Sequence, residues 1–308
     1  MRRGWRRFLT RWQNLLAIAM LAVFVYTAIA APQLAPPSDP DNAETFKRVG
    51  RVTDGVPHPP SAKALLGTTP GQFDMYYSIV WGTRSALRFG LTVALVTAIF
   101  GVLTGAISGY VGGWFGSLVM RMTDAFLTFP VIAGVWLFQQ VFFPPSPVYL
   151  EQAPSSLQAT LTSLGLDPLV MALIAFSWMP YARLINATVT RLRQAEFVLA
   201  SQSLGASAPR ILFKHVLPNA ISPAIVVLAR DVGGMVMLEA TFTFIGLGGG
   251  SEWGQLLVTN RDWIIGVGGN PLTYWWTYLP PTLALIFFGI GWNLLGDGLN
   301  DALNPHHS

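Results

Sequence analysis

Six separate apolar runs, each long enough to cross a lipid bilayer as a helix, constrain this chain more than any other feature of its sequence. A membrane-spanning helix needs about 20 mainly apolar residues. The chain is 52% hydrophobic and only 11% charged, whereas soluble domains carry about 25% charged residues. A chain so poor in charge cannot cover the surface of a water-soluble globule. We therefore expect an all-α integral membrane protein with six transmembrane helices.

The six helices are expected near residues 15–31, 87–109, 115–143, 166–187, 220–244 and 279–295. They divide the chain into a basic tail with the first helix (1–33), an extracytoplasmic segment (34–84), a five-helix core (85–300) and a short tail (301–308). The first run ends in Ala28-Ile29-Ala30 and resembles a cleavable signal peptide. We favour a retained anchor, because the run is long enough to span and a multi-span chain follows it.

Charge distribution predicts the orientation of these helices. Cytoplasmic segments next to membrane spans carry an excess of lysine and arginine. Five arginines precede the first run, and a second basic cluster surrounds residues 188–214: Arg2, Arg3, Arg6, Arg7 and Arg11, then Arg183, Arg191, Arg193, Arg210 and Lys214. Six crossings from a cytoplasmic N-terminus place both clusters, and the C-terminus, in the cytoplasm. Basic residues directly before a span indicate orientation rather than a nucleic-acid partner.

Small and polar residues within the second and third runs indicate how these helices pack. Gly101, Gly105 and Gly109 share one helical face, which permits close approach of another helix in lipid. Arg121 and Asp124 stand three residues apart at the start of the third run, so they can pair along one face. Cysteine is absent, so the chain has no disulfide and no thiolate metal site.

The fifth run carries three ionisable residues, Arg230, Asp231 and Glu239. Ionisable groups inside a span usually face a pore or a subunit contact. Arg230 and Asp231 are adjacent, so they do not face each other on a helix. For Arg230 a role at a helix–helix interface is equally compatible with the sequence.

The predicted cytoplasmic loop at 190–218 contains two short helices broken at Gly205. Phe197, Ala200 and Leu204 share a face of the first helix, and Gly205 can adopt the left-handed conformation that ends a helix. We expect a side chain at Gly205 to clash with the turn. Ser207 is placed to cap the second helix, with Pro209 in its first turn.

Pro218 should close this unit where the chain re-enters the membrane. An amphipathic helix held outside the bilayer can lie on the lipid surface or dock into a groove of a partner. The apolar face is short, so its attachment to lipid would be weak. Docking is therefore the favoured interpretation.

This loop resembles the cytoplasmic loop of ABC-importer permeases, whose pattern is Glu-Ala-Ala, three residues, Gly, nine residues, Ile-x-Leu-Pro. Gly205 is followed by nine residues and then by His215-Val216-Leu217-Pro218. Leu199-Ala200-Ser201 stands where the pattern has Glu-Ala-Ala, and His215 replaces the isoleucine. These departures are similar to the dipeptide/oligopeptide/nickel branch of the family.

The resemblance extends over about residues 65–305 and is most like the C-type permease subunit. It includes Gly109-Tyr110-Val111-Gly112-Gly113, Phe244-Ile245-Gly246-Leu247-Gly248, Trp253-Gly254 and Asn293-Leu294-Leu295-Gly296-Asp297-Gly298. Residues 70–77 and the Arg230-Asp231 pair depart from the family pattern.

The resemblance implies a type I ABC-importer-like transmembrane domain in the inner membrane, forming half of a translocation pathway for peptides or similar small solutes. It implies three kinds of protein partner besides membrane lipid: a second homologous permease subunit, expected to form a heterodimer, two cytoplasmic ABC ATPases and an extracytoplasmic solute-binding protein. ATP and Mg²⁺ would bind the ATPases, since this chain has no Gly-x4-Gly-Lys-Ser/Thr loop and is expected to be no enzyme and to hold no cofactor. The residues expected to couple to the ATPase are Glu196, Phe197, Ala200, Ser201, Leu204, Gly205, Ala206 and Pro218.

Two other classes of protein compete with this interpretation. An ion-coupled secondary transporter would use intramembrane acids such as Asp231 and Glu239, but it usually shows internal repeats, and none is evident here. An integral-membrane enzyme would need a convergent set of acids, bases or metal ligands. The four histidines all fall outside the spans, without metal-ligand spacing: His58, His215, His306 and His307.

Overall fold

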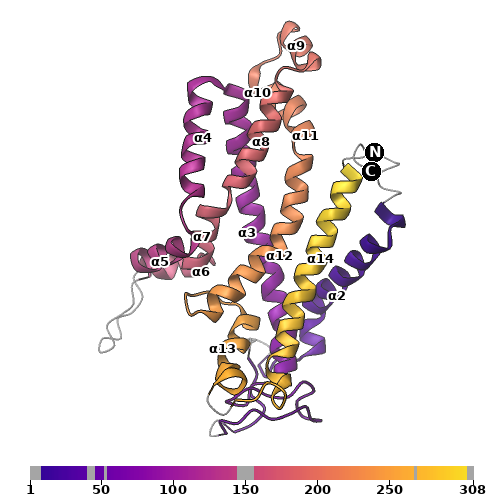
Figure 1. Cartoon of the computed structure of the whole chain (residues 1–308), viewed down its shortest axis with the longest axis vertical. Helices are drawn as coiled ribbons and strands as arrows, with labels where there is room; N and C mark the ends of the chain where they lie inside the picture. The colour runs from indigo at the N-terminus through magenta and orange to yellow at the C-terminus, as the bar shows by residue number, and fades with distance from the viewer. Residues whose placement is uncertain (1–7, 40–45, 52–53, 144–155, 267–268, 304–308) are drawn as a thin grey trace. The chain divides into compact units, whose positions relative to one another are not determined.

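A computed structural model describes residues 8–39, 46–51, 54–143, 156–266 and 269–303 (Figure 1). Within these residues the chain is helical, and its β-bridges are isolated pairs in the 46–74 segment. The helices are α2 (Trp12–Leu34), α3 (Met75–Val111), α4 (Gly113–Leu127), α5 (Val131–Phe142), α6 (Ser156–Ser163), α7 (Pro168–Ser177), α8 (Met179–Leu192), α9 (Glu196–Ser203), α10 (Ala208–Ile211), the π-helix η1 (Leu212–Val216), α11 (Leu217–Ala220), α12 (Ser222–Phe244), α13 (Glu252–Ile265), the 3₁₀ turn η2 (Trp275–Thr277) and α14 (Leu279–Leu303). The prediction of an all-α protein is confirmed for the described part of the chain.

Four helices are long and apolar enough to cross a membrane: α2, α3, the joined α7–α8 and α14. Two further pairs qualify only if each counts as one bent span. These are α4 with α5, bent by 87°, and Ala208–Ala220 with α12, bent by 59°. The described residues therefore supply four to six spans. Six residues used in the sequence analysis lie outside the described residues: Arg2, Arg3, Arg6, Arg7, His306 and His307.

Three of the predicted helices differ from the structure, the sixth only in its end, which lies at Leu303 rather than near residue 295. The second begins at Met75 rather than near residue 87 and has 37 residues, so the 34–84 segment contains its first turns. At 1.5 Å per residue it is about 55 Å long, well beyond the roughly 30 Å hydrocarbon core. The third predicted helix, 115–143, is two helices. Pro130 has an extended conformation at the N-cap of α5, and a proline disfavours helical geometry in the residue before it.

The helices form two compact units, and α3, α12 and α14 contribute to both. The first unit comprises Met1–Thr10, Thr92–Asp231 and Gly296–Ser308. Within it the glycine face of α3 lies directly against the backbone of α8. A Cβ on Gly105 would lie 2.9 Å from the Cα of Ala182, and a Cβ on Gly109 would lie 2.7 Å from the backbone oxygen of Asn186. Real Cβ atoms essentially never make contacts below 3.0 Å, so the predicted close packing is confirmed.

The second unit comprises Arg11–Leu91 and Val232–Leu295, and its centre is Trp253 at the start of α13. This side chain is 1% exposed, and its indole N–H donates to the Ile79 carbonyl of α3 at 3.2 Å. A Cβ on Gly82 would lie 2.7 Å from the indole nitrogen, so α3 needs a glycine there. The rings of Phe24 and Phe288 pack on Trp253. These contacts seat α13 against α2, α3 and α14.

Candidate functional site

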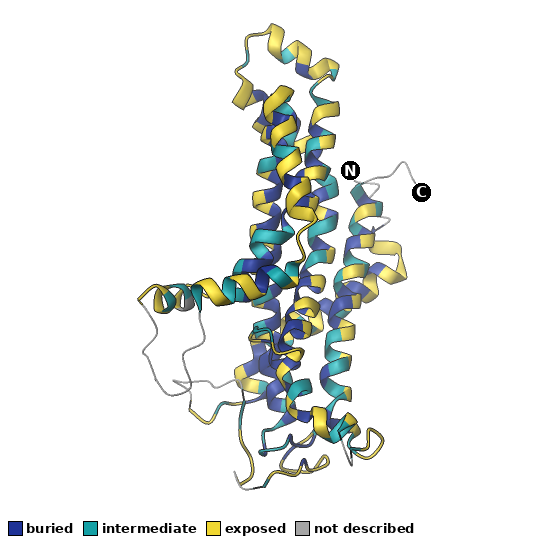
Figure 2. Cartoon of the chain, turned by 60° about the vertical axis from the view of Figure 1, so that its left-hand side comes forward, coloured by how far each residue is buried: buried dark blue, intermediate teal, exposed yellow. Residues whose placement is uncertain are grey.

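Helix α9 is held at its base and exposed along the rest of its length. Val198 is fully buried in a cluster with side chains of α3, α8, α10 and η1. Phe197 is 42% exposed and Leu204, just after the helix, is 88% exposed. Figure 2 shows α9 coloured mostly as exposed. The predicted apolar face therefore points away from the protein, while the buried contact comes from Val198, which the sequence prediction did not single out.

The other residues expected to couple to an ATPase lie on or beside this exposed face. Glu196 and Ala200 are exposed, Ser201 is half-buried, and Ala206 packs against the buried cluster. The Ser201 hydroxyl donates to the Phe197 carbonyl at 2.7 Å, so it turns inward along the helix. The face available to a partner is thus mainly Phe197, Ala200 and Leu204. We name this surface, from Glu196 to Gly205, the α9 knob.

Gly205 ends α9 in the left-handed conformation, with φ +76°, as predicted. The expected clash is wrong, because a Cβ at this position would have no heavy atom within 4 Å. A side chain is disfavoured there by the backbone conformation, which costs L-residues about 1–2 kcal/mol. The space around Gly205 is open.

The second half of the loop also differs from the prediction. Ser207 occupies the N-cap position of α10, but its side chain makes no capping hydrogen bond. Pro209 lies in the first turn of α10, as expected. Pro218 does not end the unit: it lies in the first turn of α11, directly after the π-helix η1, and the chain bends only beyond Ala220. The Leu217 N–H donates to the Leu212 carbonyl, and this wider turn lets the helix continue through a proline that has no N–H.

An arginine that the sequence prediction used only for orientation fixes the knob to α3. Arg193 donates from Nη1 to the carbonyls of Tyr110 and Val111, at 2.8 and 3.2 Å. These are the last residues of α3, where carbonyls lack helical partners and a cation is favourable. Gly112 follows with φ +65°, and a Cβ there would lie 2.6 Å from Nη1. Tyr110 is 83 residues from Arg193, so no local pattern could have indicated this contact.

The predicted pair of Arg121 with Asp124 is not the ion pair found. Asp124 instead pairs with Arg183 of α8 at 3.4 Å, and both side chains are more than half exposed. The contact joins α4 to α8 across the first unit. Exposed pairs of this kind contribute about 0–1 kcal/mol to stability.

The adjacent residues Arg230 and Asp231 contact two different helices. The Tyr181 hydroxyl of α8 donates to Oδ2 of Asp231 at 2.7 Å. Arg230 pairs with Asp297 of α14. The two side chains point to separate partners, as adjacent positions on a helix require, and both contacts lie at helix–helix interfaces. Glu239, two turns further along α12, is buried and only 3% exposed.

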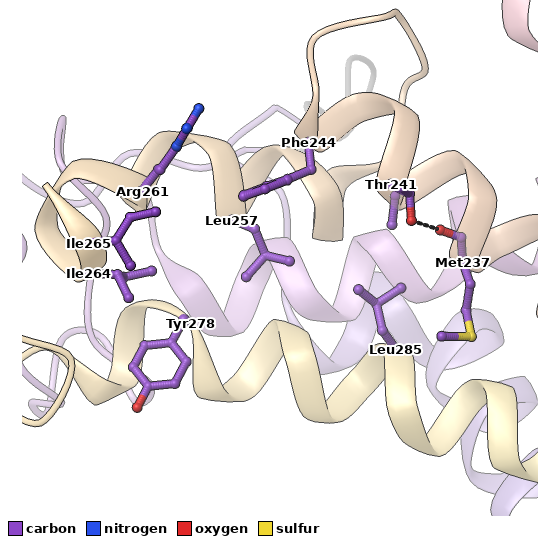
Figure 3. Close-up of a pocket in the computed structure, with 10 residues that line it drawn as sticks. Met237, Thr241, Phe244, Leu257, Arg261, Ile264, Ile265, Tyr278 and Leu285 are labelled. Carbon is purple, nitrogen blue, oxygen red and sulfur yellow. Dashed lines mark hydrogen bonds between the residues drawn. The ribbon is translucent and has the colours of Figure 1, made fainter. Parts of the chain in front are cut away.

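Two cavities lie in the second unit, on α13. The first, of about 360 Å³, is formed by α12, α13 and α14 (Figure 3) and is lined by Met237, Ala240, Thr241, Phe244, Leu257, Arg261, Ile264, Ile265, Tyr278 and Leu285. The second, of about 430 Å³, lies between the start of α13 and the 46–74 segment. It is lined by Phe46, Thr69, Phe73, Gly249, Gly250, Glu252, Gln255, Leu256 and Thr259.

Glu252 is the charged group of the second cavity and is only 7% exposed. Burial raises its pKa from 4.5 to about 7, although the Ser85 hydroxyl and its own backbone N–H hydrogen-bond to the carboxylate. Removal from water disfavours the charged form more than these two donors favour it.

Among the described residues, no group of three His, Cys, Asp or Glu side chains could hold a metal ion.

Comparison with known proteins identifies the family to which this chain belongs. A family model described as "Binding-protein-dependent transport system inner membrane component" matches residues 101–307. The dipeptide transport system permease protein DppC of Alkalihalophilus pseudofirmus is 30% identical over 299 residues, or 95% of this chain and 86% of that protein. The nickel transport system permease protein NikC of Escherichia coli is 30% identical over 301 residues, or 96% and 95%. A putative peptide transport system permease protein of Brucella suis is 29% identical over 307 residues, or 97% and 90%.

Membrane-length helices together with these matches define a permease, the membrane subunit of a transport system. The chain belongs to the family of binding-protein-dependent transport system inner membrane components. It is therefore an inner-membrane protein and not itself an enzyme, because ATP hydrolysis in such importers belongs to partner subunits. This membership excludes the ion-coupled transporter that the sequence left as an alternative.

Proposed function

We propose that this chain forms half of the translocation pathway of an ATP-driven importer for peptides or similar small solutes, and that the α9 knob docks into a groove of the ATPase. The observation that carries the docking proposal is the combination of a buried Val198 with a Leu204 that is 88% exposed. A firmly held helix with an exposed apolar tip is suited to insertion into a partner's groove. Six spans, with both termini in the cytoplasm, would put the knob on the ATPase side.

The proposed assembly contains two permease subunits, two cytoplasmic ABC ATPases and an extracytoplasmic binding protein. The second permease is a homologue rather than a copy, so the pair is a heterodimer. ATP and Mg²⁺ bind the ATPases, and this chain holds no cofactor. The family description, which names a binding-protein-dependent system, supports the binding protein as a partner. Relatives named for dipeptides and peptides support the solute class.

The contacts around the knob supply a route for its movement. When the ATPase pair closes, it displaces α9, and Val198 and Arg193 carry this displacement to α8 and to the end of α3. The glycine face of α3 lies against the α8 backbone, so these two helices move together. Tyr181 and Asp231 then connect α8 to α12. Displacement of the knob would thereby tilt spanning helices and alternate access to the pathway.

The docking proposal is tested by placing a carboxylate at the tip of the knob. Leu204→Asp should abolish co-purification of the ATPase and stop uptake, because the charge would lose its hydration in an apolar groove. Leu272→Asp is the matched control, since Leu272 is 85% exposed and lies outside the loop. This control should retain both properties. Normal ATPase recruitment by Leu204→Asp would refute the proposal.

Gly205→Asp provides a second test of the same surface. It adds a charge where the Cβ meets no neighbour, together with the backbone cost of φ +76°. Gly205→Ala carries the backbone cost alone. ATPase recruitment should fall strongly for Asp and only partly for Ala, and equal recruitment by the two variants would mean that charge at the knob does not matter.

The solute class is tested by uptake. Cells that lack their own peptide importers and express the complete system should take up radiolabelled di- and oligopeptides in an ATP-dependent manner. Uptake of nickel chelates but not of peptides would contradict the proposed class without affecting the docking proposal.

A further inference from the structure

The cavity at the start of α13 contains a buried acid whose charge is incompletely balanced. Glu252 lines this cavity and is 7% exposed. None of the described residues that line it is basic. Arg48 lies nearby, but its guanidinium stacks on the Phe73 ring and donates to the Gly71 carbonyl. Buried charges in proteins are normally paired, so an ionised Glu252 lacks a cation.

The other groups around Glu252 indicate what kind of cation would fit. Thr69, Gln255 and Thr259 supply oxygen acceptors, while Phe46 and Phe73 supply apolar walls, with their ring centres 5.9 Å apart. A divalent metal ion prefers several carboxylate or imidazole ligands, and no such group exists among the described residues. An organic ammonium needs only one carboxylate, a few acceptor oxygens and space for its apolar body. A cavity of about 430 Å³ lies in the size range of small-molecule sites.

The neighbouring cavity offers a useful contrast. Its lining is mainly apolar, and Figure 3 shows the guanidinium of the exposed Arg261 directed away from Ile264, Ile265 and Tyr278. That guanidinium lies 5.9 Å from the centre of the Phe244 ring. The first cavity therefore presents no buried charged group to a ligand, whereas the second does.

We propose that the cavity formed by Glu252, Thr259 and the Phe46–Phe73 pair binds the free ammonium end of a peptide, with the first side chain of the peptide against the two rings. This inference rests on the peptide class proposed above and goes further, since it assigns selection for a free amino terminus to the permease itself. The ammonium pairs with the Glu252 carboxylate and donates to the hydroxyl and amide oxygens. On the proposed orientation the cavity faces the extracytoplasmic side, where a solute arrives.

The test uses the purified permease–ATPase complex in lipid nanodiscs without its binding protein, so that selection by the binding protein does not contribute. Radiolabelled Phe-Ala is the probe, and phenylalaninamide and N-acetyl-Phe-Ala are competitors. Phenylalaninamide keeps the ammonium and lacks the carboxylate, so it should compete. N-acetyl-Phe-Ala lacks the ammonium and should not. Competition by N-acetyl-Phe-Ala equal to that of phenylalaninamide would overturn the proposal.

Two variants connect the binding to the cavity. Glu252→Gln should weaken Phe-Ala binding about tenfold, the loss expected for one charge-assisted hydrogen bond. Thr259→Lys keeps Glu252 and introduces an internal ammonium, so it should block binding as well. Asp262→Asn is the matched control, because it neutralises an exposed acid on the same helix, and it should bind normally. Unchanged binding in both cavity variants would overturn the proposal.

The outcomes separate this inference from its premise. If the complete system takes up peptides but phenylalaninamide does not bind the complex, the ammonium site is wrong and the solute class stands. If the complete system takes up no peptide while phenylalaninamide still binds in a manner that depends on Glu252, the solute class is wrong and the ammonium site stands. Loss of binding-protein docking in Glu252→Gln, with Phe-Ala binding intact, would assign the cavity to a basic side chain of the binding protein instead and overturn the proposal.

Discussion

The contact between α3 and α8 predicts that even a methyl side chain at Gly105 lowers the stability of the protein. A Cβ at Gly105 would lie 2.9 and 3.0 Å from the Cα and carbonyl carbon of Ala182 and closer still to its oxygen. These are backbone atoms of a helix, so they cannot rotate away. Ordinary contact distances begin at 3.4 Å, so Gly105→Ala must separate the two helices by about 0.5–1 Å, a gap comparable to the displacements that overpacking forces on protein cores.

The size of this effect follows from two opposing contributions. Overpacking costs about 1–3 kcal/mol, while replacing glycine by alanine within a helix gains about 1 kcal/mol. Gly105→Ala should therefore destabilise the protein by up to about 2 kcal/mol, and Gly105→Val by more. Gly234→Ala is the matched control, because Gly234 also lies within a helix but a Cβ there meets no heavy atom within 4 Å.

The assay is equilibrium unfolding of the purified complex in mixed micelles, with the free energy of unfolding compared between variants. Gly234→Ala should be as stable as the native chain or up to about 1 kcal/mol more stable. The reasoning is refuted if Gly105→Ala unfolds at the same point as Gly234→Ala. That result would mean that α3 and α8 can separate without loss of stability.

Three further predictions concern individual side chains. Arg193→Ala should leave the ATPase bound but lower transport per ATP hydrolysed, because the knob would no longer be tied to the end of α3; unchanged transport per ATP would contradict this role. Tyr181→Phe should destabilise the protein by about 1–3 kcal/mol, because it removes the hydroxyl that donates to the half-buried Asp231, and a second change of Asp231→Leu should restore much of the loss in unfolding measurements. Glu252→Gln should be more stable than the native chain at high pH, because the folded-state pKa of Glu252, about 7, lies above the ordinary 4.5. The free-energy penalty for ionising Glu252 in the folded protein is therefore absent below about pH 4.5 and grows as the pH rises. It is complete above about pH 7, where it amounts to about 3 kcal/mol. The third prediction is contradicted if the difference in melting temperature between the native chain and Glu252→Gln does not increase from pH 5 to pH 8.

The sequence revealed those features that depend on local periodicity. Gly101, Gly105 and Gly109 recur every four residues, so their common face and close packing could be predicted from helical geometry. Gly205 could likewise be assigned to the left-handed region from its place after a short helix. The clash expected there could not be judged, because the surrounding space depends on the tertiary structure.

Features that depend on distant residues were beyond the sequence. Arg230 and Asp231 were recognised as unusual, but their partners lie 67 and 50 residues away, and nothing in the local pattern indicates which helices meet. The break in the third predicted helix was missed for a related reason. Membrane helices tolerate proline when neighbouring groups satisfy the freed carbonyls, so Pro130 alone could not separate a bent helix from two helices.

The division of α9 into a buried base and an exposed tip has a consequence for how importers of this family diversify. Val198 holds the helix in place, so changes at Phe197 or Leu204 need not disturb the rest of the permease. A duplicated permease can therefore acquire a new tip, and with it a new ATPase, through a few substitutions at exposed positions. In a cell that contains several such importers, the tip would determine which ATPase each permease binds and would prevent binding to the ATPases of the other importers.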